Sequence, residues 1–439
     1  MEDPGYEKNS LTLIGTVAMG TGVMIGAGIF ALTGQVAELA GSWFPLAFLM
    51  AAVVSGFSAY SYIKVCNKYP SAGGIAMVLE RAYGKGTVTA AAALLMALSM
   101  IISESLVART FANYTLQLFG IKGGIAVPLL AVGLVVFAFL VNIAGNKVIG
   151  ALSKVTAIIK IGGILAFAGA ALWVAGFDFK PPSADSFSQI ESFIAATAIA
   201  ILAYKGFTTI TNSGGEVVNP ERNVGRAIMI SLAICLVVYM AVALAVSSAL
   251  SIPEIIAARD YSLAEAARPA LGQYGVWFTV GIAIIATTSG ILASMFAVSR
   301  MLTMLTEMKL IPHSHLGMPG DIHQHLLVYT AVCAALLAAL FDLSRIAALG
   351  AIFYLLMDMI VHWGVLRHLR RDVGAKAPIL VTALVLDAVA LVAFVAVKLQ
   401  SDPLIPLIGI SGIAAIFAFE WFYLGPLRDS EQKVDAQKG

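Results

Sequence analysis

The sequence predicts an all-α polytopic membrane protein with about twelve transmembrane helices. Of its 439 residues, 60% are hydrophobic. Only 12% are charged, about half the share that a soluble domain carries. Apolar stretches of about 20 residues recur along nearly the whole chain, and each is long enough to cross a hydrocarbon core of about 30 Å as a helix. We therefore expect the chain to be embedded in a lipid bilayer.

Hydropathy and helix-breaking residues place six spans in each half of the chain. The first six are expected near residues 11–38, 43–66, 87–118, 124–143, 148–176 and 190–214. The second six are expected near residues 227–250, 274–304, 325–342, 346–366, 377–398 and 403–424.

The charge distribution predicts the orientation of these spans. An even number of spans leaves both termini on one side, and lysine and arginine are enriched in cytoplasmic loops. With the termini inside, 17 basic residues fall in inner segments and six in outer loops. We therefore expect an integral membrane protein of the cell (inner) membrane with cytoplasmic termini. The net charge of +2 is spread over many loops, so nucleic acid is not an expected partner.

Two spans contain helix-breaking residues at equivalent places. The first carries four glycines in nine residues, Gly20, Gly22, Gly26 and Gly28, and each weakens a helix by about 1 kcal/mol relative to alanine. The sixth combines glycines with small polar residues over 203–215. If spans 1 to 5 and 6 to 10 are inverted repeats, the two breaks meet at a binding site near the membrane midplane. The alternative is that the glycines only allow close helix packing.

An unwound membrane segment persists only where protein, water or a solute satisfies its backbone groups. A zwitterion supplies both kinds of partner. Its carboxylate suits the N–H groups at the positive end of a half-helix, and its ammonium suits free carbonyls at the opposing end. The breaks therefore favour an amino acid as the small-molecule substrate.

Several motifs resemble those of the amino acid-polyamine-organocation (APC) superfamily of amino acid permeases. The run from Met24 to Phe30 is similar to the glycine-rich motif of its first helix. The segment Glu216–Ile228, with Asn219, Pro220 and Arg222, resembles the family's Glu-x-x-x-Asn-Pro-x-Arg segment after helix 6. Shorter matches lie at 69–74, 142–145, 299–300 and 310–312.

The resemblance implies a leucine-transporter-like core of five-plus-five inverted repeats with unwound helices 1 and 6. The expected organisation is a cytoplasmic tail at 1–10, a ten-helix transport core at 11–366, two additional transmembrane helices at 377–424 and a cytoplasmic tail at 425–439.

The resemblance also implies a substrate site, carried over by position. The N–H groups of Gly26, Ala27 and Gly28 would hold the substrate carboxylate. Carbonyls near Met24, Leu202 and Lys205 would receive the ammonium. Phe207 is a candidate lid over the occupied site, with a core phenylalanine as the alternative.

Lys160 lies within span 5, where a charge costs about 2.5 to 3.5 kcal/mol on insertion scales. It matches a lysine that some family members place where sodium-coupled relatives bind sodium. There its ammonium would contact the carbonyl of Gly22 and could load and release a proton. The alternative is a lysine that extends to the inner interface.

Lys205 departs from the family pattern, which usually has an apolar residue there. A cation at this place would repel polyamines and arginine. It could favour an acidic substrate side chain, or it could bond Glu104, the one carboxylate well inside span 3. Hydroxyls at 287–289 are placed where sodium-coupled relatives use them as ligands.

We therefore expect a secondary active transporter that works by alternating access, most simply as proton-coupled symport with Lys160 and Gly22 as the coupling pair. Ion-independent exchange, sodium-coupled symport and a non-transporting amino acid sensor are the alternatives. An ATP-binding loop and a nucleophile with an adjacent base are both missing from the sequence, so neither an ATP-driven pump nor an enzyme is expected. We expect no cofactor and no metal site, although His313, His315, His323 and His325 form two His-x-His elements.

Overall fold

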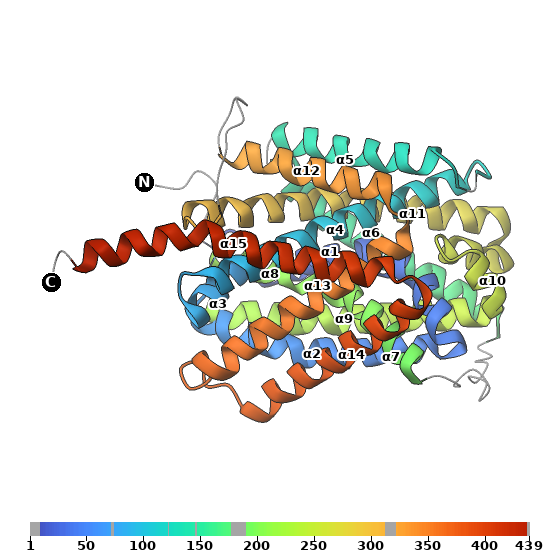
Figure 1. Ribbon diagram of the computed structural model, residues 1–439. Coiled ribbons are helices and arrows are strands. Elements are labelled where there is room, and N and C mark those ends of the chain that lie inside the picture. The colour runs from blue at the N-terminus through green and yellow to red at the C-terminus, as the bar shows by residue number, and fades with distance from the viewer. Residues whose placement is uncertain are drawn as a thin grey trace.

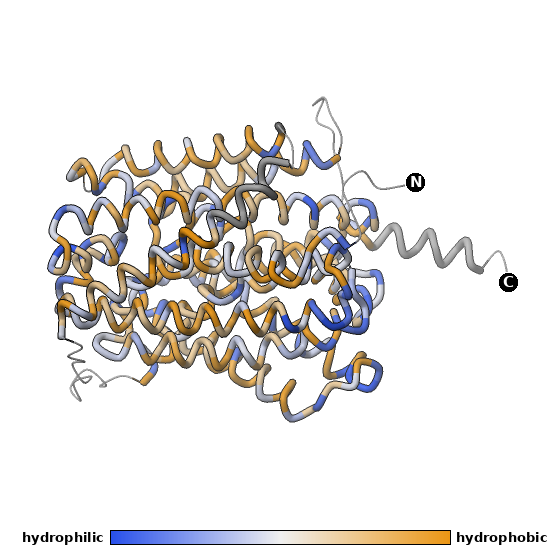
Figure 2. The backbone as a smooth tube through the Cα atoms, turned by 180° about the vertical axis from the view of Figure 1, so that it is seen from behind, coloured by the Kyte–Doolittle hydropathy of each residue, from blue (hydrophilic) through white to orange (hydrophobic). Residues whose placement is uncertain are grey.

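The protein was examined as a computed structural model, which describes residues 9–71, 74–121, 123–144, 147–176, 190–311 and 322–436. These parts of the chain are helical, with one isolated parallel bridge between Leu11 and Val217. The helices run roughly side by side and form an elongated bundle (Figure 1). Hydrophobic residues follow the length of the helices, and hydrophilic residues gather mostly near the ends of the bundle (Figure 2).

The first six spans are formed by seven helices. They are α1 (Leu13–Ala40), α2 (Phe44–Lys68), α4 (Thr87–Gln117), α5 (Ala126–Ala144), α6 (Lys147–Val174), and α7 (Ile190–Tyr204) with the short α8 (Phe207–Asn212). The second six are α9 (Pro220–Ala249), α11 (Ser262–Glu307), α12 (Ile322–Leu340), α13 (Leu343–Gly364), α14 (Ala377–Ser401) and α15 (Leu404–Ala436). Two further short helices, α3 (Gly74–Tyr83) and α10 (Ile252–Ala257), lie between spans.

The long apolar helices of the described chain lie where the sequence predicts membrane spans. By length and hydropathy, eleven described segments can cross a membrane. The first of them, Gly28–Lys68, joins the end of α1 to α2, and the apolar segment Leu13–Gly26 precedes it. Helices α1 and α2 are separate in the bundle, and the all-α polytopic fold is confirmed.

The predicted break in span 6 is present. Helix α7 ends at Tyr204, Lys205 and Gly206 form a turn, and α8 begins at Phe207. The predicted break in span 1 is corrected by the structure, because α1 is helical from Leu13 to Ala40. Its glycines act instead as close-packing positions. A Cβ on Gly28 would lie 2.7 Å from Ala203 Cα, and one on Gly26 would lie 3.1 Å from Ala286 O.

Helix α1 is the centre of the bundle. It packs against α7 and α8, and also against α6, α9 and α11. Helix α14 packs against α2, α7 and α13, so it adjoins the helix that contains the break. The break and the middle of α1 are therefore enclosed by helices from both halves of the chain.

Candidate substrate site

The α7–α8 break lies directly against α1. A Cβ on Gly206 would lie 2.7 Å from Met24 Cγ and 2.9 Å from Met24 N, so only glycine fits at this crossing. The hydroxyl of Tyr239, on α9, lies 2.7 Å from Met24 O and 2.9 Å from Ala203 O. Tyr239 therefore bridges carbonyls of the two helices that form the predicted site.

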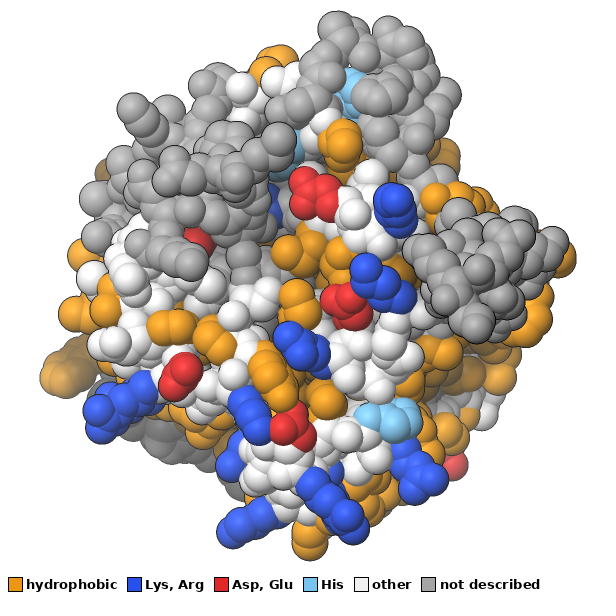
Figure 3. Space-filling view, turned by 90° about the vertical axis from the view of Figure 1, so that its left-hand side faces the viewer, with side chains coloured by type: hydrophobic (Ala, Val, Ile, Leu, Met, Phe, Trp, Pro, Cys, Tyr) orange, Lys and Arg blue, Asp and Glu red, His pale blue; other side chains and the backbone are white. Residues whose placement is uncertain are grey.

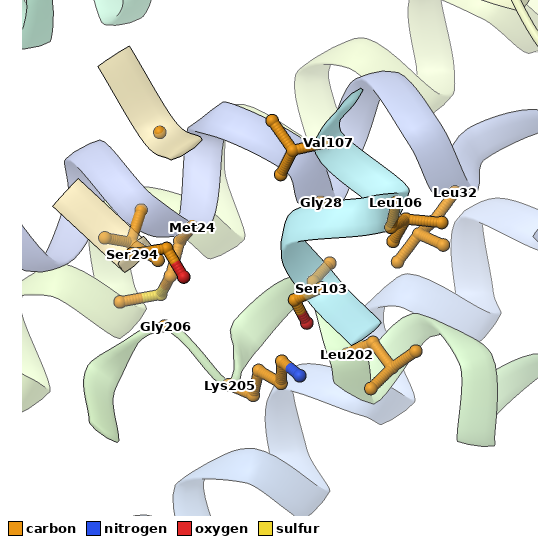
Figure 4. A pocket seen from close by; sticks show the side chains of 13 residues that line it. Met24, Gly28, Leu32, Ser103, Leu106, Val107, Leu202, Lys205, Gly206 and Ser294 are labelled. Carbon is orange, nitrogen blue, oxygen red and sulfur yellow. The ribbon is translucent and has the colours of Figure 1, made fainter. Parts of the chain in front are cut away.

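A cavity of about 40 Å³ opens beside this crossing. One water molecule needs about 10 to 15 Å³ by the same measure, so the cavity has room for a few waters or a small polar solute. Its polar side chains come from three places (Figure 4): Ser103 from α4, Ser294 from α11, and Lys205 from the break. The rest of the lining is apolar or glycine: Val23, Met24, Gly28, Leu32, Leu106, Val107, Leu202, Ala203, Gly206 and Gly290.

Four of the residues expected to hold substrate line this cavity: Met24, Gly28, Leu202 and Lys205. Gly26 and Phe207 are not part of the described lining. Gly26 faces the backbone of α11, and the ring of Phe207 is buried against Tyr62 with 5.4 Å between centroids. In this conformation Phe207 packs as a core residue, and the carbonyl of Met24 is occupied by Tyr239.

Lys205 turns toward α4 and α13. Its Nζ donates to Ser99 O at 2.9 Å and lies 3.1 Å from Ser99 Oγ. It also lies 5.7 Å from the centroid of the Tyr354 ring, within cation–π range. Among the described residues it makes no ion pair with Glu104 within 4.0 Å.

Glu104 is fully buried on α4 and lies next to the cavity wall. Its Oε1 accepts a weak hydrogen bond from Ser294 Oγ at 3.4 Å. Its Oε2 has no hydrogen-bond partner among the described residues. Arg109, five residues further along α4, donates to Ala338 O, so Glu104 and Arg109 have different partners.

Lys160 makes the contact that the family resemblance implied. Its Nζ donates to Gly22 O at 2.8 Å, which joins α6 to α1, and the side chain is almost completely buried. The hydroxyls expected as sodium ligands bond within their own helix: Thr287 Oγ1 to Ala283 O, and Ser289 Oγ to Ala286 O.

Polar contacts close both ends of the site. At the end that holds the start of α9, Glu216 forms an ion pair with Arg300 at 2.9 Å. At the other end, Arg259 pairs with Glu38 at 2.6 Å, and Gln35 Nε2 donates to Asp260 Oδ1 at 2.9 Å. Burial raises the pKa of the Asp260 carboxyl above its usual value.

Sequence reasoning missed the two cavity serines, and it missed three ionisable residues that meet at 0% exposure, Asp358, His362 and Asp387. The serines carry no pattern that separates them from packing residues. The three ionisable residues could have been found, because they lie inside the predicted spans 346–366 and 377–398, where the rule applied to Lys160 also holds. Of the two His-x-His elements, His313 and His315 lie outside the described residues, while His323 and His325 are on α12.

Comparison with known proteins gives a consistent assignment. The family model described as "Amino acid permease" matches residues 11–423. The chain is 30% identical to the inner membrane transport protein YbaT of Escherichia coli over 405 residues, covering 90% of this chain and 92% of that protein.

Two more distant relatives carry substrate names. The branched-chain amino acid permease BcaP of Lactococcus lactis is 28% identical over 53% of this chain and 55% of its own length. The vacuolar cationic amino acid transporter 2 of Arabidopsis thaliana is 26% identical over 81% of this chain and 59% of its own length. With a family model that covers nearly the whole chain, this protein belongs to the amino acid permeases of the APC superfamily.

Proposed function

We propose that this amino acid transporter is a secondary carrier that couples uptake of its substrate to protons by alternating access. The observation that carries the proposal is the bond from Lys160 to Gly22 O. Through one ionisable group, it joins α1, which lines the cavity, to α6. When the ammonium loses its proton, the charge-assisted part of this bond is lost, so α1 can shift relative to α6.

In this scheme the contacts at the two ends of the site break in turn. When the substrate site opens to the side on which α9 begins, Glu216 separates from Arg300. When the site opens to the opposite side, Arg259 separates from Glu38. Figure 3 views the end of the bundle at which the described chain begins and ends in Figure 1, and Lys and Arg side chains are numerous there. This charge favours a cytoplasmic location for that end.

The substrate we propose is an α-amino acid with a small or apolar side chain. The cavity wall is largely apolar, and the ammonium of Lys205 disfavours a cationic side chain. The substrate ammonium and carboxylate would bind backbone groups of α1 and of the break once the Tyr239 bridge opens. In the loaded state α1 would unwind near Gly26, Ala27 and Gly28, which would free their N–H groups for the carboxylate. Met24 and Leu202 would supply carbonyls, and Phe207 would close over the site.

Exchange without protons is the second candidate, favoured by the fact that Lys160 already has a bond that it could keep throughout the cycle. Sodium coupling is less favoured, because the Lys160 ammonium occupies the junction of α1 and α6 and the hydroxyls of Thr287 and Ser289 bond within α11.

The test is uptake of a panel of labelled amino acids into proteoliposomes, with and without an inward proton gradient, for the wild type and Lys160→Ala. Proton symport predicts gradient-stimulated uptake that the variant loses. Uptake that needs an amino acid trapped inside, regardless of the gradient, would make the protein an exchanger. Substrate binding without flux would make it a sensor, and no response to any amino acid would refute the substrate class.

A further inference from the structure

A second set of ionisable side chains lies away from Lys160, between α2, α13 and α14. Asp358 and His362 are one turn apart on α13, and Asp387 comes from α14. His362 Nε2 lies 3.5 Å from Asp358 Oδ2 and 3.2 Å from Asp387 Oδ2. All three side chains have 0% exposure, so water does not stabilise their charges. We call these three residues the α13–α14 cluster.

Two members of the cluster are held by hydroxyl groups of α2. Ser58 Oγ and Tyr62 Oη each donate to Asp358 at 2.5 Å. Ser61 Oγ lies 2.7 Å from His362 Nδ1. These bonds fix Asp358 and turn the free Nε2 edge of His362 toward both carboxylates.

Asp387 differs from Asp358 because it accepts no hydrogen bond from a described hydroxyl or N–H group. Its close polar neighbour is His362 Nε2, 3.2 Å from Oδ2, and the geometry of that contact does not make a hydrogen bond. A buried carboxylate without donors is costly when ionised. With both aspartates ionised and His362 protonated, the cluster would carry a net charge of −1. One proton bound to an oxygen of Asp387 makes the whole cluster neutral. It also gives the Asp387 carboxyl group an O–H donor.

The other titratable groups that face the cluster cannot supply this neutralisation by a direct ion pair. Within the described chain they are Tyr62 from α2, Tyr354 from α13 itself and, beyond Tyr354, Lys205 in the break. Tyr354 is one turn before Asp358 on α13.

The cluster also contacts the parts that line or border the substrate cavity. Tyr354 lies between Asp358 and Lys205, and the ring of Tyr62 packs edge-on against Phe207, the first residue of α8. A change of charge at Asp387, passed to Asp358 through His362, can therefore reach both residues that flank Gly206.

We propose that the α13–α14 cluster is a second proton-binding centre, which takes up one exchangeable proton on Asp387 and links its occupancy to the α7–α8 break. The step is a simple protonation: carboxylate and proton give carboxyl, and no other bond is made or broken. The link to transport rests on the proposed function, whereas the proton site itself does not.

The experiment is infrared difference spectroscopy of the purified full chain in lipid, recorded between acid and alkaline pH without substrate. A protonated buried carboxyl gives its own C=O stretch. The expected result is one component of that band that is lost in Asp387→Asn and shifted in His362→Gln. Glu420→Gln is the matched control, because Glu420 is also fully buried and neither of its oxygens has a described hydrogen-bond partner, but it lies on α15. That variant should leave the His362-sensitive component in place.

An Asp387→Asn spectrum equal to that of the wild type would overturn the proton site. A stoichiometric metal ion in the wild-type protein that is absent from Asp387→Asn would overturn it as well, in favour of a metal centre. Because Asp→Asn nearly conserves size and shape, elution as a single species and retained substrate binding are expected of the variant.

The link to transport has its own readout. The pH profile of uptake should shift in Asp387→Asn and stay as in the wild type in Glu420→Gln. An unshifted profile in Asp387→Asn refutes the link. Failure of all amino acid uptake in the wild type would refute the proposed function and would leave the infrared result standing.

Discussion

The Nζ of Lys160 lies 2.8 Å from the carbonyl oxygen of Gly22, and this bond joins α6 to the helix that forms one wall of the substrate cavity. Gly22 precedes the cavity residues Val23 and Met24 on α1. The ionisable group therefore acts one residue away from the cavity wall without being part of it.

Lys160→Arg should lose the response of uptake to a proton gradient, because the guanidinium keeps its charge at every working pH. Residual uptake independent of the gradient is expected to remain. The measurement is initial uptake in proteoliposomes across a range of outside pH. Thr287→Ala is the control, since that hydroxyl bonds within α11. A sodium requirement that disappears in Thr287→Ala would contradict proton coupling.

Lys205→Met should relax the discrimination against cationic amino acids. The substitution keeps a long side chain but removes the ammonium, and it leaves the buried acidic residue Glu104 beside the cavity wall. We expect arginine or lysine uptake to rise relative to leucine, by about tenfold for each 1.4 kcal/mol of repulsion removed. Competition assays with labelled substrate measure this ratio.

The double variant Lys205→Met with Glu104→Gln is the matched control for selectivity. It removes both charges, so any part of the gain that comes from attraction to Glu104 should disappear, while the part that comes from the lost repulsion by Lys205 should remain. If both variants show the wild-type preference, Lys205 does not sense the substrate side chain.

Arg300→Gln should destabilise the protein more than Arg259→Gln. The Arg300–Glu216 pair has side-chain exposures of only 14% and 11%, and losing one partner of a buried pair costs about 3 to 5 kcal/mol, so we expect a value near the lower end. The Arg259–Glu38 pair has exposures of 42% and 33%, where a pair contributes about 1 kcal/mol or less. Thermal unfolding followed by tryptophan fluorescence compares the stabilities of the two variants. Equal midpoints would show that the Arg300–Glu216 pair stabilises the fold no more than the Arg259–Glu38 pair does.

Gly28→Ala should prevent the approach of α1 to α7. The added Cβ would lie 2.7 Å from Ala203 Cα and 2.9 Å from the Tyr239 hydroxyl, so backbone must move. We expect loss of transport and a lower thermal midpoint. Gly162→Ala on α6 is the control, because nothing lies within 4 Å of its added Cβ, and it should be neutral or stabilising by up to about 1 kcal/mol. Similar effects in both would mean that helix propensity outweighs packing.

The fold was largely predictable because span length and hydropathy depend on local composition. The approximate limits of the twelve spans and the break at Lys205 and Gly206 follow from apolar stretches and breaker residues. Whether α1 is broken or continuous could not be predicted in this way. Glycine lowers helix propensity and permits close packing at the same time, and at Gly26 and Gly28 the contacts with Ala286 and Ala203 determined the outcome.

The candidate site was predictable only in part. Lys160 could be found because a charge inside an apolar span is rare and needs a partner, and its contact with Gly22 is present. Ser103 and Ser294 could not be found, since which face of α4 or α11 meets the cavity depends on packing between distant helices. Phe207 was placed in the right element, but its packing partner, Tyr62, comes from α2, which is far away in the sequence.

Asp387 on α14 completes a group whose other two members, Asp358 and His362, belong to the predicted ten-helix core. Helix α14 therefore contributes one member of a polar group that it shares with the core. A shortened chain that ends after α13 would leave Asp358 and His362 without their acidic neighbour. In related sequences, loss of Asp387 should be accompanied by changes at 358 and 362, so these three columns of an alignment should vary together even where the rest of α14 varies freely.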